Sequence, residues 1–136
     1  KIDYIAVLEI PKIKLKRGIV DKNSSYNNVN RNIYTLKETT MPDEEDNSHI
    51  MLASHSGNSY ISYFKNLNKL NLNDEVYFFY KNNKYVYKVI KKYEVEKTGT
   101  VKLSKKNSSD ITLITCVSGT NNQIVLVANL ESIENY

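Results

Sequence analysis

Residues 110–130 contain the strongest fold signal in this chain, two short apolar runs that are separated by a turn. The runs at residues 111–115 and 123–128 are rich in β-branched and apolar side chains, which favour β-strands. Residues 118–122 between them favour turns. The only cysteine, Cys116, directly follows the first run. The pattern predicts a hairpin with a thiol at the end of a buried strand, where a rigid element can hold a nucleophile.

Similar short patterns recur along the rest of the chain and predict a mainly β fold. Strands are expected at residues 4–10, 12–15, 33–36, 49–55, 75–80 and 84–93. Gly18 is expected to permit a turn after the second of these strands. Apolar side chains at residues 60–70 recur at helical spacing, which predicts a short amphipathic helix. A total of about seven or eight short strands with one or two short helices suggests a closed or nearly closed β-barrel.

The composition is typical of one soluble globular domain, since 40% of the 136 residues are hydrophobic and 25% are charged. A domain over residues 1–136 can bury its own core. The single cysteine excludes an intrachain disulfide. No stretch approaches the roughly 20 apolar residues of a membrane span. Because the chain begins at Lys1 and not at Met, we expect that an N-terminal membrane anchor has been removed.

The net charge of +4 comes from scattered lysines, many of them at alternating positions of the expected strands. This pattern is typical of a solvated strand face. The alternative is a surface that faces an anionic wall polymer, lipid headgroups or nucleic acid. The sequence contains no nucleic-acid-binding motif, so we expect no nucleic-acid partner.

Cysteine catalysis needs a thiolate, a proton carrier beside it and hydrogen-bond donors for the developing oxyanion. Histidine is the natural proton carrier. The chain has two histidines, His49 and His55, at opposite ends of one expected strand, so they lie roughly 20 Å apart along an extended chain. Only one can reach Cys116, and His55 is the better candidate because loops at strand ends often carry sites. Residue types alone leave open a buried structural cysteine and an ordinary surface histidine.

Two segments around these residues resemble the signatures of sortases, the cysteine transpeptidases of Gram-positive cell surfaces. TLITC at residues 112–116, followed by a loop and an apolar strand, is similar to the family pattern of TLxTC, a loop, an arginine and a strand. HIMLASHSGN at residues 49–58 and YFKNLNKLNLNDEVYF at residues 63–78 look like the second family signature. Residues 4–20 resemble the first two family strands. The resemblance covers nearly the whole chain and implies an eight-stranded barrel.

The resemblance gives roles to the matching positions. Cys116 would be the nucleophile that attacks the Thr–Gly carbonyl of a sorting motif. His55 would protonate the leaving amine and then activate the incoming one. The residues that would flank the substrate groove are Ala53, Ile114 and Thr115.

One position departs from the family, because the third catalytic residue, an arginine, is replaced by Gln123. A glutamine amide can donate two hydrogen bonds without charge. It would stabilise an oxyanion less than an arginine does, by about 1–2 kcal/mol. Three interpretations remain open. Gln123 acts as the donor, Arg17 or Arg31 swings in, or the chain is a weakly active or inactive member.

The implied function is transfer of the acyl group of an LPxTG-like C-terminal sorting motif, through a Cys116 thioester, to an amine. The partners would be secreted proteins with that motif and an acceptor such as a lipid-linked cell-wall precursor or a pilin lysine. The expected location is the extracellular face of the cell membrane of a Gram-positive-type bacterium. A cysteine hydrolase on the same barrel and a non-catalytic peptide-binding barrel are the alternatives.

Residues 43–46 form an acidic run, DEED. Some sortases bind calcium through carboxylates in the equivalent loop, and oxygen-rich loops suit calcium. Residues 101–109 lack the acid that helps in those sortases. A solvated acidic loop without a cofactor is therefore the favoured interpretation, with calcium as the alternative. No cluster of His and Cys residues supports zinc.

Overall fold

A computed structural model describes residues 2–57, 59–97, 108–117 and 119–136. Its strands are β1 Tyr4–Ile10, β2 Leu15–Val20, β3 Tyr34–Thr35, β4 His49–Ala53, β5 Glu75–Tyr80, β6 Asn83–Glu96, β7 Asp110–Cys116 and β8 Asn122–Asn135. The helical elements of these residues are two 3₁₀ turns, η1 Pro11–Ile13 and η2 Leu67–Lys69. No helix among the described residues has the length and apolar character that crossing a bilayer requires. The predicted mainly β fold is confirmed.

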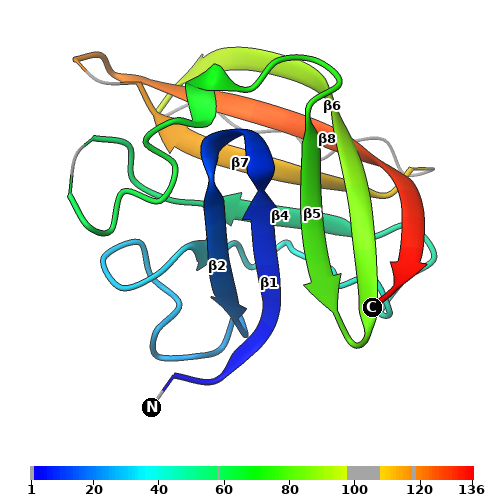
Figure 1. Ribbon diagram of the computed structural model, residues 1–136. Helices are drawn as coiled ribbons and strands as arrows, with labels where there is room; N and C mark the ends of the chain where they lie inside the picture. Colours follow the sequence, from blue (N-terminus) through cyan, green and yellow to red (C-terminus); the bar gives the residue numbers. More distant parts are fainter. Residues whose placement is uncertain (1, 58, 98–107, 118) are drawn as a thin grey trace.

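The eight strands form one sheet in the order β2-β1-β5-β6-β8-β7-β4-β3, which curls into a nearly closed barrel (Figure 1). Side chains of β3 and of the segment before it bond to the other edge strand, β2. The Thr35 hydroxyl donates to the Val20 carbonyl at 3.4 Å, and the Asn32 amide donates to the Gly18 carbonyl at 3.0 Å. All strand pairs are antiparallel except β4 and β7, which run parallel. The carboxyl ends of β4 and β7 therefore meet at one rim of the barrel (Figure 1).

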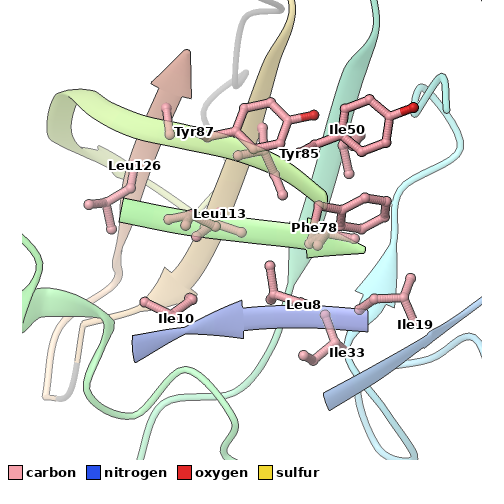
Figure 2. Close-up of a cluster of buried hydrophobic side chains, with 14 of the residues drawn as sticks. Leu8, Ile10, Ile19, Ile33, Ile50, Phe78, Tyr85, Tyr87, Leu113 and Leu126 are labelled. Atoms are coloured by element: carbon pink, nitrogen blue, oxygen red, sulfur yellow. The ribbon is translucent and has the colours of Figure 1, made fainter. Parts of the chain in front are cut away.

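Alternating side chains of the strands fill the interior of the barrel. Leu8, Phe78 and Leu113 come from three different strands and point into this interior (Figure 2). Full burial of one such side chain stabilises the fold by about 1.5–3 kcal/mol. The rim that carries the ends of β4 and β7 is thus held on a rigid support.

The opposite face of β4, β7 and β8 carries a second apolar group, which we call the outer cluster. Its buried members are Met51, Ile114, Val125 and Val127, and its partly buried members are Leu36, Ala53, Tyr93 and Val95. The period of two along a strand explains the division, because Leu113 faces the interior and Ile114 faces outward. The barrel wall beside the rim is therefore apolar on both faces.

The predicted helix at residues 60–70 is wrong in its geometry. The structure shows turns and the 3₁₀ turn η2 there, with hydrogen bonds from Leu67 N to Phe64 O and from Leu70 N to Leu67 O. Phe64, Leu67 and Leu70 are nevertheless buried. These apolar residues recur every three positions, which is the period of a 3₁₀ helix and not the 3.6 of an α-helix. The apolar positions were therefore predicted correctly, whereas the regular helix over residues 60–70 was not.

The predicted strand at residues 12–15 and the predicted turn at Gly18 are also wrong. Residues Pro11–Ile13 form η1, and β2 runs from Leu15 through Gly18 without a turn. Gly18 is needed for a different reason, because a Cβ atom there would lie 2.4 Å from the ring of Tyr4. Close packing of an aromatic ring on the strand, and not a change of chain direction, requires the glycine.

Candidate active site

Cys116 and Gln123 lie side by side at the rim of the barrel. Cys116 is the last residue of β7, and its partner in the antiparallel ladder with β8 is Gln123. Directly opposed residues of such a pair project to the same face, with Cβ atoms about 4.5–5.5 Å apart. The Cys116 thiol is free and half-buried. A side-chain amide is therefore positioned next to a thiol that reagents can reach.

The loop that carries His55 is fixed to the same rim by hydrogen bonds. The parallel register of β4 and β7 pairs Ala53 with Ile114, and it continues past the strand end because the Ser54 amide donates to the Ile114 carbonyl at 3.2 Å. The Thr115 hydroxyl then donates to the Ser54 carbonyl at 2.8 Å. His55 directly follows Ser54, so the loop that carries it begins at the rim that carries Cys116.

The bond from Thr115 to Ser54 gives a testable prediction about the rim. Thr115 is buried, at 4% exposure, and Thr115→Val keeps its shape but leaves the Ser54 carbonyl without this donor. We expect the free energy of unfolding in urea to fall by about 1–3 kcal/mol. The matched control is Thr112→Val, also buried on β7, whose hydroxyl bonds to none of the described residues. Equal losses in the two variants would show that the bond does not hold the rim.

A third residue, Asn30, contacts the imidazole. His55 Nε2 lies 3.3 Å from Asn30 Oδ1, and an amide oxygen can only accept a hydrogen bond. The contact is a hydrogen bond when Nε2 carries a proton, and it then holds the imidazole beside Asn30. Sequence reasoning missed this contact, because Asn30 lies in a segment rich in asparagine and serine that no local pattern distinguishes.

The two arginines make contacts of other kinds. Arg17 Nε donates to Asn32 Oδ1 at 2.6 Å, and its guanidinium lies over the Tyr63 ring at 4.8 Å. Arg31 Nη1 donates to the Ser25 carbonyl at 3.3 Å. Within the described residues neither guanidinium contacts Cys116 or His55. Gln123 is therefore the predicted donor that lies in register with the thiol.

The three predicted substrate residues lie in two environments. Ala53 and Ile114 are register partners and belong to the outer cluster. Thr115 is buried and bonds to the loop of His55, and it also lines a cavity. That cavity, which we call the rim cavity, has a volume of about 200 Å³. It is lined by Ser56, Phe64, Lys65, Asn68, Thr115, Cys116, Val117 and Ile124.

The other histidine, His49, lies at the opposite end of β4 from the rim. Its Nδ1 is 3.0 Å from Oδ1 of Asp110, the buried first residue of β7. The parallel register pairs the same two residues. Sequence reasoning correctly placed His49 and His55 at opposite ends of this part of the chain.

The acidic run makes hydrogen bonds both to the end of β5 and within its own loop. Asp43 accepts from the Tyr80 hydroxyl at 3.0 Å, and its hydrogen bond with the Lys81 ammonium holds the pKa of the Asp43 carboxyl below its usual value. Glu44 accepts from the Met41 amide at 2.6 Å. No group of three or more His, Cys, Asp or Glu residues within the described ranges is arranged to hold a metal ion. Calcium binding by this loop stays a prediction.

A family model described as a sortase domain matches residues 8–131 of the chain. Sortase A from Corynebacterium diphtheriae, as a lid mutant, is similar with 21% identity and a TM-score of 0.83, over 97% of this chain and 72% of that chain. Sortase A from Listeria monocytogenes has 20% identity and a TM-score of 0.79, over 98% of this chain and 90% of that chain. Sortase C-1 from Actinomyces oris has 26% identity and a TM-score of 0.82, over 95% of this chain and 74% of that chain. None of the curated protein sequences matches the chain.

Proposed function

Because this chain belongs to the sortase family, we propose that it is a cysteine transpeptidase that uses Cys116 as its nucleophile. The observation that carries the proposal is the common rim of β4 and β7, where the thiol, the Gln123 amide and the His55 loop meet. The donor substrate is an LPxTG-like C-terminal sorting motif of a secreted protein. The acceptor is an amine of a cell-wall precursor or a pilin lysine, at the extracellular face of a Gram-positive-type membrane.

In the first half-reaction the Cys116 thiolate attacks the Thr–Gly carbonyl carbon and forms a tetrahedral intermediate. The protonated imidazole of His55 transfers its proton to the departing amine nitrogen while the C–N bond breaks. The acyl group remains on Cys116 as a thioester. In the second half-reaction an amine attacks this thioester, His55 accepts the proton of the amine, and the sulfur leaves as a thiolate.

The outer cluster supports a position for the donor peptide. Ala53 and Ile114 belong to it, and Cys116 follows Ile114 on the same face of β7. The partly buried members Tyr93 and Val95 extend this apolar surface onto β6. A sorting motif with apolar Leu and Pro residues would bury area against these side chains while its Thr–Gly bond reaches the thiol.

Gln123 is proposed as the hydrogen-bond donor to the oxyanion. This role predicts that one substitution at Gln123 increases the reaction rate. Gln123→Arg should raise the rate of thioester formation about tenfold, because a charged donor stabilises an oxyanion by about 1–2 kcal/mol more than a neutral one. Gln123→Leu, which keeps the size and removes the donors, should lower the rate. The rates are measured by single-turnover mass spectrometry. No change in either variant would remove Gln123 from the mechanism.

Product analysis with and without an amine tests the proposed reaction. A transpeptidase converts a sorting peptide into an amide when an amine is supplied, and the yield rises with amine concentration. A hydrolase releases the free acid whether or not the amine is present. A peptide-binding barrel forms neither product, and its Cys116 reacts with a mild alkylating reagent no faster than a free model thiol. Only the first pattern agrees with the proposal.

A further inference from the structure

The rim cavity reaches Cys116 from a different direction than the outer cluster. By alternation Cys116 belongs to the outward face together with Ile114. The cavity instead lies between residues 64–68, which lead into η2, and the inward-facing Ile124 of the core. Figure 1 shows η2 on the same side of the barrel as the ends of β7 and β4. A donor acyl group on the outer cluster would therefore leave the cavity open beside the thioester.

The lining of the cavity includes several polar side chains, one of them charged. Polar side chains come from Ser56, Lys65, Asn68 and Thr115, and no carboxylate is among the lining residues. Lys92 adds positive charge next to the lining residue Asn68, because its ammonium donates to the carbonyls of Asn68 at 2.6 Å and Leu70 at 3.1 Å. On the same strand, Glu94 accepts from the Asn122 side chain at 3.2 Å. Two lysines, Lys65 and Lys92, therefore lie in or next to the lining of the cavity.

We infer that the rim cavity is the entrance for the acceptor, and that it selects small amines that carry a carboxylate one or two residues from the nucleophilic nitrogen. This inference rests on the proposed transpeptidase function. Lys65 supplies the charge that the carboxylate meets. A volume of about 200 Å³ suits a residue or two of a peptide, since drug-sized ligands need roughly 300 Å³ or more.

The cation in the cavity lining, Lys65, also favours the chemistry of the second half-reaction. Only a neutral amine is nucleophilic, and a nearby cation disfavours the protonated form of an amine. In the step itself the amine nitrogen attacks the carbonyl carbon of the Cys116 thioester, so that a C–N bond forms and the C–S bond breaks. The amine proton passes to the neutral imidazole of His55, whose neighbour Ser56 lines the cavity, and the sulfur leaves as a thiolate.

Two matched acceptors, glycylglycine and glycylglycinamide, test the inference with a sorting peptide as donor at low ionic strength. We expect the wild type to show a KM about threefold to fivefold lower for glycylglycine. Lys65→Met should remove this preference, and Lys65→Glu should reverse it. Lys69→Glu is the control, because Lys69 is an exposed lysine of η2 that does not line the cavity. Thioester formation and hydrolysis of the donor are measured in every variant, and the acceptor preference is compared as the ratio of the two KM values within each variant.

The outcomes separate this inference from the function on which it rests. If the wild type forms the thioester but uses both acceptors equally, or if Lys65→Glu behaves like Lys69→Glu, the cavity is not the acceptor entrance. If the wild type forms no thioester, the transpeptidase function itself is wrong and the inference falls with it. Added salt should reduce the preference for glycylglycine, because exposed charges are screened.

Discussion

Cys116→Ala is expected to abolish both the amide product and the hydrolysis product of a sorting peptide. The chain has one cysteine, so no second thiol can take over the nucleophilic step. Background reaction in water is too slow to detect, because enzymes accelerate such reactions by at least about 10⁶-fold. The half-buried position of Cys116 at the end of β7 allows alanine without loss of a core contact. Liquid chromatography of the products measures the effect.

The control for the Cys116→Ala variant is a check that the protein still folds like the wild type. Its circular dichroism spectrum and unfolding midpoint in urea should match those of the wild type, so that lost activity reports the missing sulfur alone. Continued joining of the peptide to an amine by a well-folded Cys116→Ala protein would contradict the assignment of the nucleophile.

The second large effect is expected for His55→Ala. Loss of the proton carrier should lower kcat by about 10²–10⁴-fold, because general acid–base catalysis contributes a factor of this size. The loop itself should stay in place, since backbone atoms anchor it. The Ser54 amide donates to the Ile114 carbonyl, and the His55 carbonyl accepts from the Phe64 amide at 3.2 Å. Steady-state kinetics with a sorting peptide and an amine give the rate.

His49→Ala is the matched control, because His49 lies at the opposite end of β4 and pairs with Asp110. It should leave kcat near the wild-type value, although it removes a partner of a buried carboxylate and can lower stability. Similar losses of kcat in the two variants would mean that the effect of His55→Ala is structural.

The strand pattern of the chain was largely readable from the sequence because β-strands have a period of two. Cys116 was correctly predicted at the end of a strand, and the ladder of β7 and β8 follows from the turn residues between them. The outward position of Ile114 also follows from alternation. Local rules failed at two places. At residues 60–70 a spacing of three was interpreted as a short amphipathic helix, and at Gly18, which accommodates the Tyr4 ring, a turn was predicted.

The parts of the candidate site that depend on contacts between distant segments were not predictable from the residues. The contact of Asn30 with His55 joins positions 25 residues apart, and the bond from Thr115 to Ser54 joins positions 61 residues apart. Lys65 reaches the rim cavity only because residues 64–68 fold against β7 and β8. One sequence carries no local pattern for such tertiary contacts.

The most direct test of the account is the intact mass of the protein after incubation with LPxTG-like peptides in the absence of an amine. The account predicts an increase equal to the acyl fragment that ends at the motif threonine, located on Cys116 by peptide mapping and released by hydroxylamine. The Cys116→Ala protein should show no increase. A wild-type protein that gains no mass from any sorting peptide, or gains it at another residue, would contradict the account.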